Sequence, residues 1–212
     1  MPSLEYDQVQ KRDISPELMG RLKRTGTAVI RGTVPEQEAL GFVEDLKNYI
    51  RANPSVKAYP PDSPQVFELY WSRAQLRARA HPRMLDTQAF LNGLFHSSDP
   101  FTKLDTHTPG LTYADRLRIR QPGDAKFALG PHIDGGGVER WEDAAYRRTY
   151  HDIFEGKWEQ YDPWDLADRV YANMDMYQGA GACTMLRAFQ VRLSPLCPCT
   201  ENVEADSLHR AG

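Results

Sequence analysis

His132 and Asp134 stand one residue apart in the segment Gly130-Pro131-His132-Ile133-Asp134. On a β-strand, residues i and i+2 point to the same side, so this spacing brings an imidazole nitrogen and a carboxylate oxygen to one pocket. Two histidines and one carboxylate on one face of Fe(II) form a facial triad, which leaves positions open for a keto acid and O₂. The spacing therefore predicts two thirds of such an iron site.

The His-x-Asp spacing is not specific on its own, because a chain of this composition contains about 0.5 such pairs by chance. A hydrogen-bonded loop histidine is the structural alternative for His132. The flanking sequence favours a ligand, since Gly130-Pro131 precedes the pair and three glycines at 135–137 free the backbone directly after it. We take His132 and Asp134 as the candidate metal ligands and catalytic residues.

Two arginines precede this pair in a segment, 111–121, whose residues alternate in polarity. Leu117 and Ile119 alternate with Arg118 and Arg120, as expected of a strand with two different faces. A guanidinium group binds a carboxylate through two parallel hydrogen bonds, which suits a keto-acid cosubstrate or an acidic substrate. Arg118 and Arg120 are therefore candidate cofactor-binding residues, and a solvated strand face is the alternative.

These side chains must be positioned by elements that the apolar periodicity, capping residues and turn signals predict along the chain. Helices are predicted over 15–24, 72–80, 83–95, 138–154 and 162–171. A further helix is predicted to begin at the capping-box spacing of residues 33–36 and to end at Asn53. Strands are predicted over 27–31, 66–71, 111–121 and 183–193, with a turn at 121–124 and loops over 54–64 and 97–110.

Composition limits the classes of protein to which the chain can belong. Its 212 residues carry a net charge of −3, which gives no electrostatic footprint for nucleic acid or an anionic membrane. With 41% hydrophobic residues and only short apolar runs, we expect one soluble globular domain. The three cysteines, an odd number late in the chain, favour a reducing, cytoplasmic location.

Four longer segments resemble the YbiU-like family of fungal and bacterial proteins, over a stretch from about Ile14 to Gln190. They are 65–72 (QVFELYWS), 115–124 (DRLRIRQPGD), 130–136 (GPHIDGG) and 138–143 (VERWED). This family is placed among the Fe(II)/2-oxoglutarate dioxygenase-like proteins.

The resemblance implies an α+β fold in which helices pack around a double-stranded β-helix, or jelly roll. It implies a dioxygenase-like domain over residues 14–190 and a divergent tail over 191–212. It makes His132 and Asp134 the first two iron ligands, with 2-oxoglutarate as cosubstrate. The activity it implies is that of an oxidoreductase that hydroxylates or desaturates a small molecule.

The chain departs from the family pattern after Gln190, where family members resemble one another through further jelly-roll strands, a distal histidine and a basic residue for 2-oxoglutarate. We therefore expect a truncated jelly roll, from a mis-spliced or frame-shifted gene model or a genuine truncation. His209 has only three residues after it, which leaves no strand for the cosubstrate arginine. The alternatives are a catalytically inactive jelly-roll protein with at most a binding role, and a metal-free sugar- or lipid-binding module on the same fold.

Overall fold

The structure is a computed structural model that describes residues 1–102, 110–112, 114–119, 137–179 and 186–194. Its α-helices are α1 (Tyr6–Lys11), α2 (Pro16–Thr25), α3 (Glu36–Ala52), α4 (Arg73–Arg79), α5 (Pro82–Asn92), α6 (Glu139–Glu142), α7 (Ala144–Arg148) and α8 (His151–Phe154). Its strands are β1 (Ser3–Glu5), β2 (Val29–Arg31), β3 (Ala58–Tyr59), β4 (Val66–Phe67) and β5 (Leu117–Arg118), and two 3₁₀ turns, η1 (Trp158–Gln160) and η2 (Arg169–Tyr171), follow α8.

The first strand, β1, pairs in parallel with β2, with Leu4 opposite Ile30. No element was predicted before residue 15, because a strand of three residues followed by a helix of six is too short to show a period. Leu4 and Val9 are nevertheless fully buried. The amino-terminal segment therefore contributes directly to the core.

Helix α2 begins and ends as its sequence predicts. The Ser15 side chain accepts a hydrogen bond from the backbone N–H of Leu18 at 3.2 Å, and Pro16 occupies the first helical position. Gly26 ends the helix with a φ of 64°, a left-handed conformation that glycine adopts without steric cost. The predicted helix and the strand after it are both confirmed.

Helix α3 ends at Ala52, in agreement with the predicted stop at Asn53, but its start differs in detail. The capping residue is Pro35 and no side chain caps the helix, so the predicted role of Thr33 in a capping box is wrong. The Thr33 hydroxyl instead lies 3.5 Å from the carbonyl oxygen of Ile30. The apolar face of α3 packs against α4 and α5 in a small core of Val34, Ala39, Phe42, Ala74 and Met84.

A larger core joins parts of the chain that are far apart in sequence. Trp164 packs there with residues of β1, α1, α2 and α5, and its indole N–H donates to the Lys23 carbonyl oxygen at 3.1 Å. The buried members are Leu4, Val9, Leu22, Phe90, Leu91, Leu94 and Trp164.

The second sheet is antiparallel and has the order β3-β4-β5. The predicted loop over 54–64 is wrong at residues 58–59, which form β3, and the predicted strand over 66–71 is shorter than expected. Pairing to β4 makes β3 a strand although proline and serine dominate its surroundings. Long-range pairing thus overrides the local turn signals.

The predicted long helix over 138–154 is wrong, since three short helices occupy this segment. Asp143 separates α6 from α7 with a ψ of 126°, which no α-helical residue adopts, and its carboxylate accepts a hydrogen bond from the Tyr146 N–H at 2.8 Å. A residue that caps a helix competes with its continuation. The predicted helix over 162–171 is also wrong apart from the single turn η2.

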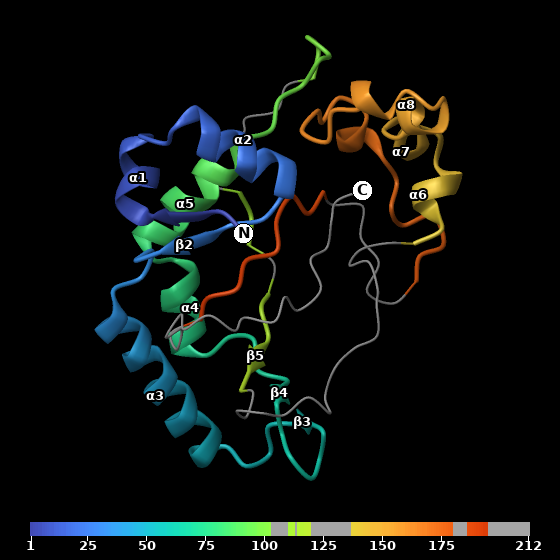
Figure 1. Cartoon of the computed structure of the whole chain (residues 1–212). Coiled ribbons are helices and arrows are strands. Elements are labelled where there is room, and N and C mark those ends of the chain that lie inside the picture. The colour runs from blue at the N-terminus through green and yellow to red at the C-terminus, as the bar shows by residue number, and fades with distance from the viewer. Residues whose placement is uncertain (103–109, 113, 120–136, 180–185, 195–212) are drawn as a thin grey trace.

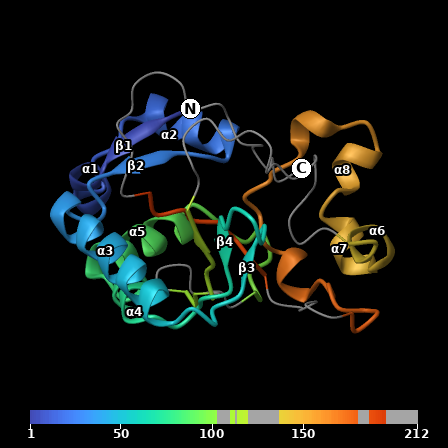
Figure 2. The ribbon, with the colours of Figure 1, turned by 90° about the horizontal axis from the view of Figure 1, so that it is seen from below.

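The predicted strand over 183–193 is not present in its described part, 186–193, which forms neither helix nor strand. Helices α6, α7 and α8 lie on the opposite side of the molecule from α1 and α3 in both ribbon views (Figures 1 and 2). The described residues therefore form an α+β arrangement with a two-stranded and a three-stranded sheet, neither of them closed within that part of the chain.

Candidate functional site

Of the four residues predicted to carry chemistry, the structure describes Arg118. His132, Asp134 and Arg120 lie outside the described residues, as do the three cysteines and His209. We begin with the sheet that carries Arg118, because its strand β5 precedes the predicted ligand segment along the chain.

Arg118 lies in β5 opposite Val66 of β4, and Leu117 lies opposite Phe67. Phe67 is buried, whereas Arg116 and Arg118 are both exposed. The predicted alternation of arginine and aliphatic residues is thus confirmed over residues 116–119. The arginines share the open face of the sheet, and the aliphatic side chains share the other face.

The start of β5 is held against α4 by Asp115. Its carboxylate accepts a hydrogen bond from the Gln75 side-chain amide at 3.0 Å and forms an ion pair with Arg79. Gln75 is buried and also forms a capping box with Ser72 at the start of α4. These contacts fix where β5 begins and hence the position of its arginines.

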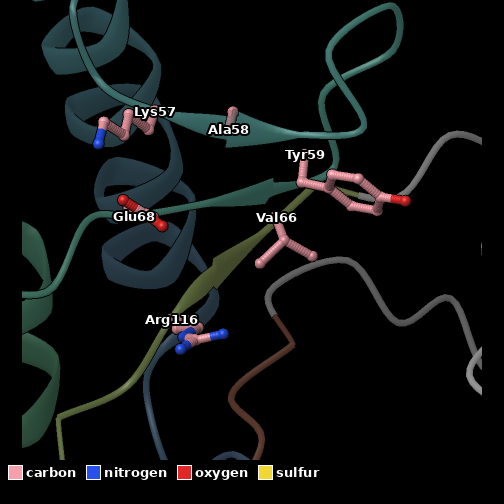
Figure 3. Close-up of a pocket in the computed structure, with 6 residues that line it drawn as sticks. All are labelled: Lys57, Ala58, Tyr59, Val66, Glu68 and Arg116. Atoms are coloured by element: carbon pink, nitrogen blue, oxygen red, sulfur yellow. The ribbon is translucent and has the colours of Figure 1, made fainter.

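A pocket of about 420 Å³ opens on the three-stranded sheet (Figure 3). Its lining comes from all three strands and the residues next to them, namely Lys57, Ala58, Tyr59, Val66, Glu68 and Arg116. Pockets for small molecules have volumes of roughly 300–1,000 Å³, so this one has the size of a small-ligand site.

The pocket has a charged end and a more apolar end. Lys57, Glu68 and Arg116 lie together at one end, and Tyr59 and Val66 lie at the other (Figure 3). The strand register explains this separation, because it places Tyr59 opposite Val66 and continues from there to the charged residues.

The charged groups of the pocket do not neutralise one another. Within the described ranges, no side-chain ion pair of 4 Å or less involves Lys57, Glu68 or Arg116. Arg116 lies over the Tyr70 ring, with 6.0 Å between the guanidinium carbon and the ring centre. A charged side chain without an ion pair at a pocket is available to a ligand.

Sequence reasoning missed Lys57, Tyr59 and Glu68 as site residues. Lys57 and Tyr59 fall in a segment rich in proline and serine that predicts a loop. For Glu68 a signal was present, because Phe67 and Leu69 alternate with it and both are buried. That period of two places Glu68 on the open face of the sheet.

Three histidines lie in described segments outside this sheet, and two of them make structural contacts. His81 accepts a hydrogen bond from the Arg83 N–H at the start of α5, and His96 lies 3.3 Å from a carboxylate oxygen of Asp162. His151 is exposed on α8. Among the residues that the structure describes, no group of three or more potential metal ligands occurs.

Two solved structures show with which proteins this chain shares its fold. The fold is shared with a Salmonella typhimurium LT2 protein solved under the name "Putative Oxidoreductase", at 32% identity and a TM-score of 0.72 over 81% of this chain and 44% of that one. It is also shared with the GlcNAc-inducible gene 2 product of Candida albicans, at 27% identity and a TM-score of 0.72 over 84% of this chain and 38% of that one.

The chain itself belongs to the Gig2-like family, whose model matches residues 1–198. It is 32% identical over 210 residues to the uncharacterized protein YbiU of Escherichia coli K12, which covers 93% of this chain and 50% of YbiU. The predicted YbiU-like relationship is thereby confirmed. The chain spans about half the length of the curated relative it matches.

None of the helices in the described part of the chain is long and apolar enough to cross a membrane.

Proposed function

We propose that this chain carries the metal-binding part of an Fe(II)/2-oxoglutarate-dependent oxidoreductase that hydroxylates or desaturates a small molecule. The oxidoreductase class is supported by the name of the Salmonella relative. The dioxygenase chemistry, a jelly-roll fold and a domain spanning residues 14–190 are supported by the sequence resemblance. A cytoplasmic location remains a prediction.

The observation that carries the proposal is the position of Arg118 on the open face of the sheet. Arg118 precedes His132 by 14 residues, is exposed, and lies opposite Val66, a residue that lines the pocket. A guanidinium on an otherwise open sheet face can hold a carboxylate through two hydrogen bonds. A keto-acid cosubstrate carries such a carboxylate.

The donor types fit the proposed metal. An imidazole and a carboxylate separated by one residue supply two of the three ligands of the facial arrangement that Fe(II) oxygenases use. His132 and Asp134 would hold the iron, and Arg118 and Arg120 would orient the cosubstrate carboxylate. Bound iron, with 2-oxoglutarate as the co-reductant, would allow O₂ to oxidise a C–H bond of the substrate.

The proposal is tested by anaerobic visible absorption of the purified chain with Fe(II), before and after 2-oxoglutarate is added. A charge-transfer band is expected when iron and the keto acid bind together, and His132→Ala should abolish it. His151→Ala is the matched control, because His151 is exposed on α8. A wild-type chain without the band, or a band that persists in His132→Ala, contradicts the proposal.

Arg118→Gln tests the cosubstrate role separately. It removes the charge of an exposed side chain, so the fold should be unchanged. The concentration of 2-oxoglutarate that gives half of the maximal absorbance of the band should rise by about tenfold, which corresponds to a loss of about 1.4 kcal/mol in binding free energy. An unchanged half-saturating concentration of 2-oxoglutarate would show that Arg118 does not bind the cosubstrate.

The second candidate function is that of a metal-free binding protein, and the pocket on the sheet favours it. Its volume and its separate charged and apolar ends are those of a ligand site whether or not iron binds elsewhere. Loss of the absorption band together with ligand binding at the pocket would support this candidate.

A further inference from the structure

The charged end of the pocket is a row of three side chains across the sheet. The register that pairs Tyr59 with Val66 continues to Lys57 and Glu68, and the Glu68 N–H donates to the Lys57 carbonyl oxygen at 2.8 Å. The register between β4 and β5 continues from Phe67 and Leu117 to Glu68 and Arg116. The row therefore reads cation, anion, cation, with the carboxylate in the middle.

Directly opposite side chains of opposite charge normally pair across a sheet, because their Cβ atoms lie only about 5 Å apart. Glu68 makes no such ion pair with a described residue. Its side chain is exposed, as are those of Lys57 and Arg116. All three charged groups can therefore reach a ligand in the pocket.

The alternating charges favour a ligand that carries both signs. A purely anionic ligand is attracted by Lys57 and Arg116 but leaves Glu68 unpaired, and a purely cationic ligand is attracted by Glu68 but repelled by the two cations beside it. A ligand with an ammonium group and a carboxylate can satisfy both signs at once. Charge complementarity of this kind gives a site its specificity.

The other end of the pocket offers apolar surface beside a further cation, because Arg118 lies opposite Val66 in the row that contains Tyr59. The Tyr59 side chain is 61% exposed and lies beside Val66, so both offer apolar surface. Two residues along a strand span about 6.6 Å, which separates the apolar row from the charged row. The ligand should thus be a small molecule with a charged head and an apolar or aromatic body.

We propose that this pocket binds a small zwitterion of the amino-acid class with an apolar or aromatic side chain. The ammonium group binds Glu68, the carboxylate binds Lys57 and Arg116, and the side chain packs on Tyr59 and Val66. The proposal goes beyond the iron chemistry and does not depend on it, because each residue that it uses belongs to the described sheet.

The test is isothermal titration calorimetry of the full chain, without iron or 2-oxoglutarate, using three probes that share a phenyl ring. L-Phenylalanine carries both charges, 3-phenylpropionate lacks the ammonium group and 2-phenylethylamine lacks the carboxylate. We expect L-phenylalanine to bind at least tenfold more tightly than either singly charged probe. Equal affinities, or no binding of L-phenylalanine, overturn the proposal.

Two variants test which residue of the pocket binds which charged group of the ligand. Glu68→Gln should weaken L-phenylalanine binding by about tenfold and leave 3-phenylpropionate binding unchanged or tighter. Arg116→Gln should weaken the binding of both acids. Matched controls are Glu159→Gln and Arg21→Gln, which alter exposed charges on η1 and α2 and should leave all three affinities unchanged.

Circular dichroism shows whether each variant is folded, and these substitutions on an exposed face should leave the spectrum unchanged. A folded Glu68→Gln variant that keeps the wild-type preference for L-phenylalanine overturns the proposal. Because the titrations contain no iron, their failure and the failure of the iron-dependent absorption band are separate results.

Discussion

Asp165 shows how a single carboxylate can join two distant segments of this chain. One of its oxygens, Oδ1, accepts hydrogen bonds from the backbone N–H groups of Ser98 and Ala167, both at 3.0 Å. Burial by itself raises the pKa of Asp165, but the hydrogen bonds from Ser98 and Ala167 outweigh it, and the pKa lies below its ordinary value of 3.8.

This lowered pKa predicts a pH-dependent contribution to stability. Since the folded-state pKa lies below the unfolded-state value, the contribution is present above pH 3.8 and is lost as the pH falls through the folded-state pKa. Asp165→Asn should lower the free energy of unfolding by about 1.5 kcal/mol at pH 7, the lower end of the value of hydrogen bonds to a charged acceptor, because Asp165 is only partly buried. Urea unfolding at pH 7 and pH 2.5 measures it.

The difference between wild type and Asp165→Asn should shrink at pH 2.5, because below pH 3.8 the unfolded state takes up a proton at this carboxyl group and the stabilising effect of the lowered pKa falls. Asp152→Asn on α8 is the control, and its effect should stay within about 0.5 kcal/mol at both pH values. An Asp165→Asn deficit that is the same at both pH values would show that charge is not the cause.

At the scale of elements, sequence periodicity predicted the helices that have both a cap and an apolar face. Helices α2 and α5 carry a proline at their first turn, and α4 has a serine cap followed by a glutamine that completes the capping box. These signals are local, so they can be read without knowing the rest of the fold. Strands β4 and β5 fall within predicted strands, whereas β3 carries no comparable signal because proline and serine dominate its surroundings.

Helix α7 is the element whose start the apolar pattern failed to predict. Asp143 caps it, and Asp143→Ala removes the hydrogen bond to the Tyr146 N–H. We expect a loss of about 1 kcal/mol in the free energy of unfolding, together with faster hydrogen exchange at the Tyr146 amide.

Asp143→Ser is the matched control, because serine caps helices about as well as aspartate. It should retain most of the stability that Asp143→Ala loses. Equal destabilisation by both substitutions would show that the aspartate acts through something other than the cap.

At the scale of the whole molecule, Trp164 connects the late part of the chain to the amino-terminal core. Its ring lies 4.9 Å from the Phe95 ring and 6.1 Å from the Phe189 ring, and its indole donates to Lys23. No sequence pattern predicts these contacts, since they join residues separated by up to 141 positions. The sequence resemblance was specific enough to predict the relationship to the YbiU-like family, but it did not predict the contacts of Trp164 with the amino-terminal core.

Trp164→Ala should lower the free energy of unfolding by about 3–5 kcal/mol, because it leaves a large cavity in the core. Trp164→Phe keeps a ring and loses the hydrogen bond, so its cost should be smaller than that of Trp164→Ala. Chemical denaturation followed by circular dichroism measures both.

Trp158→Ala is the control for this pair, since Trp158 is 65% exposed and its loss should cost less than about 0.5 kcal/mol. If Trp164→Ala were no more destabilising than Trp158→Ala, the larger core would not depend on the late part of the chain.

The same core has a consequence for how the protein folds during its synthesis. Leu4 and Val9 leave the ribosome before Trp164, which packs in the same core and follows about 160 residues later. At roughly 5–20 residues per second, the nascent chain waits about 8–30 s for that partner. During this interval the apolar faces of β1, α1 and α2 lack part of their cover, so we expect them to be bound by chaperones until the tryptophan is translated.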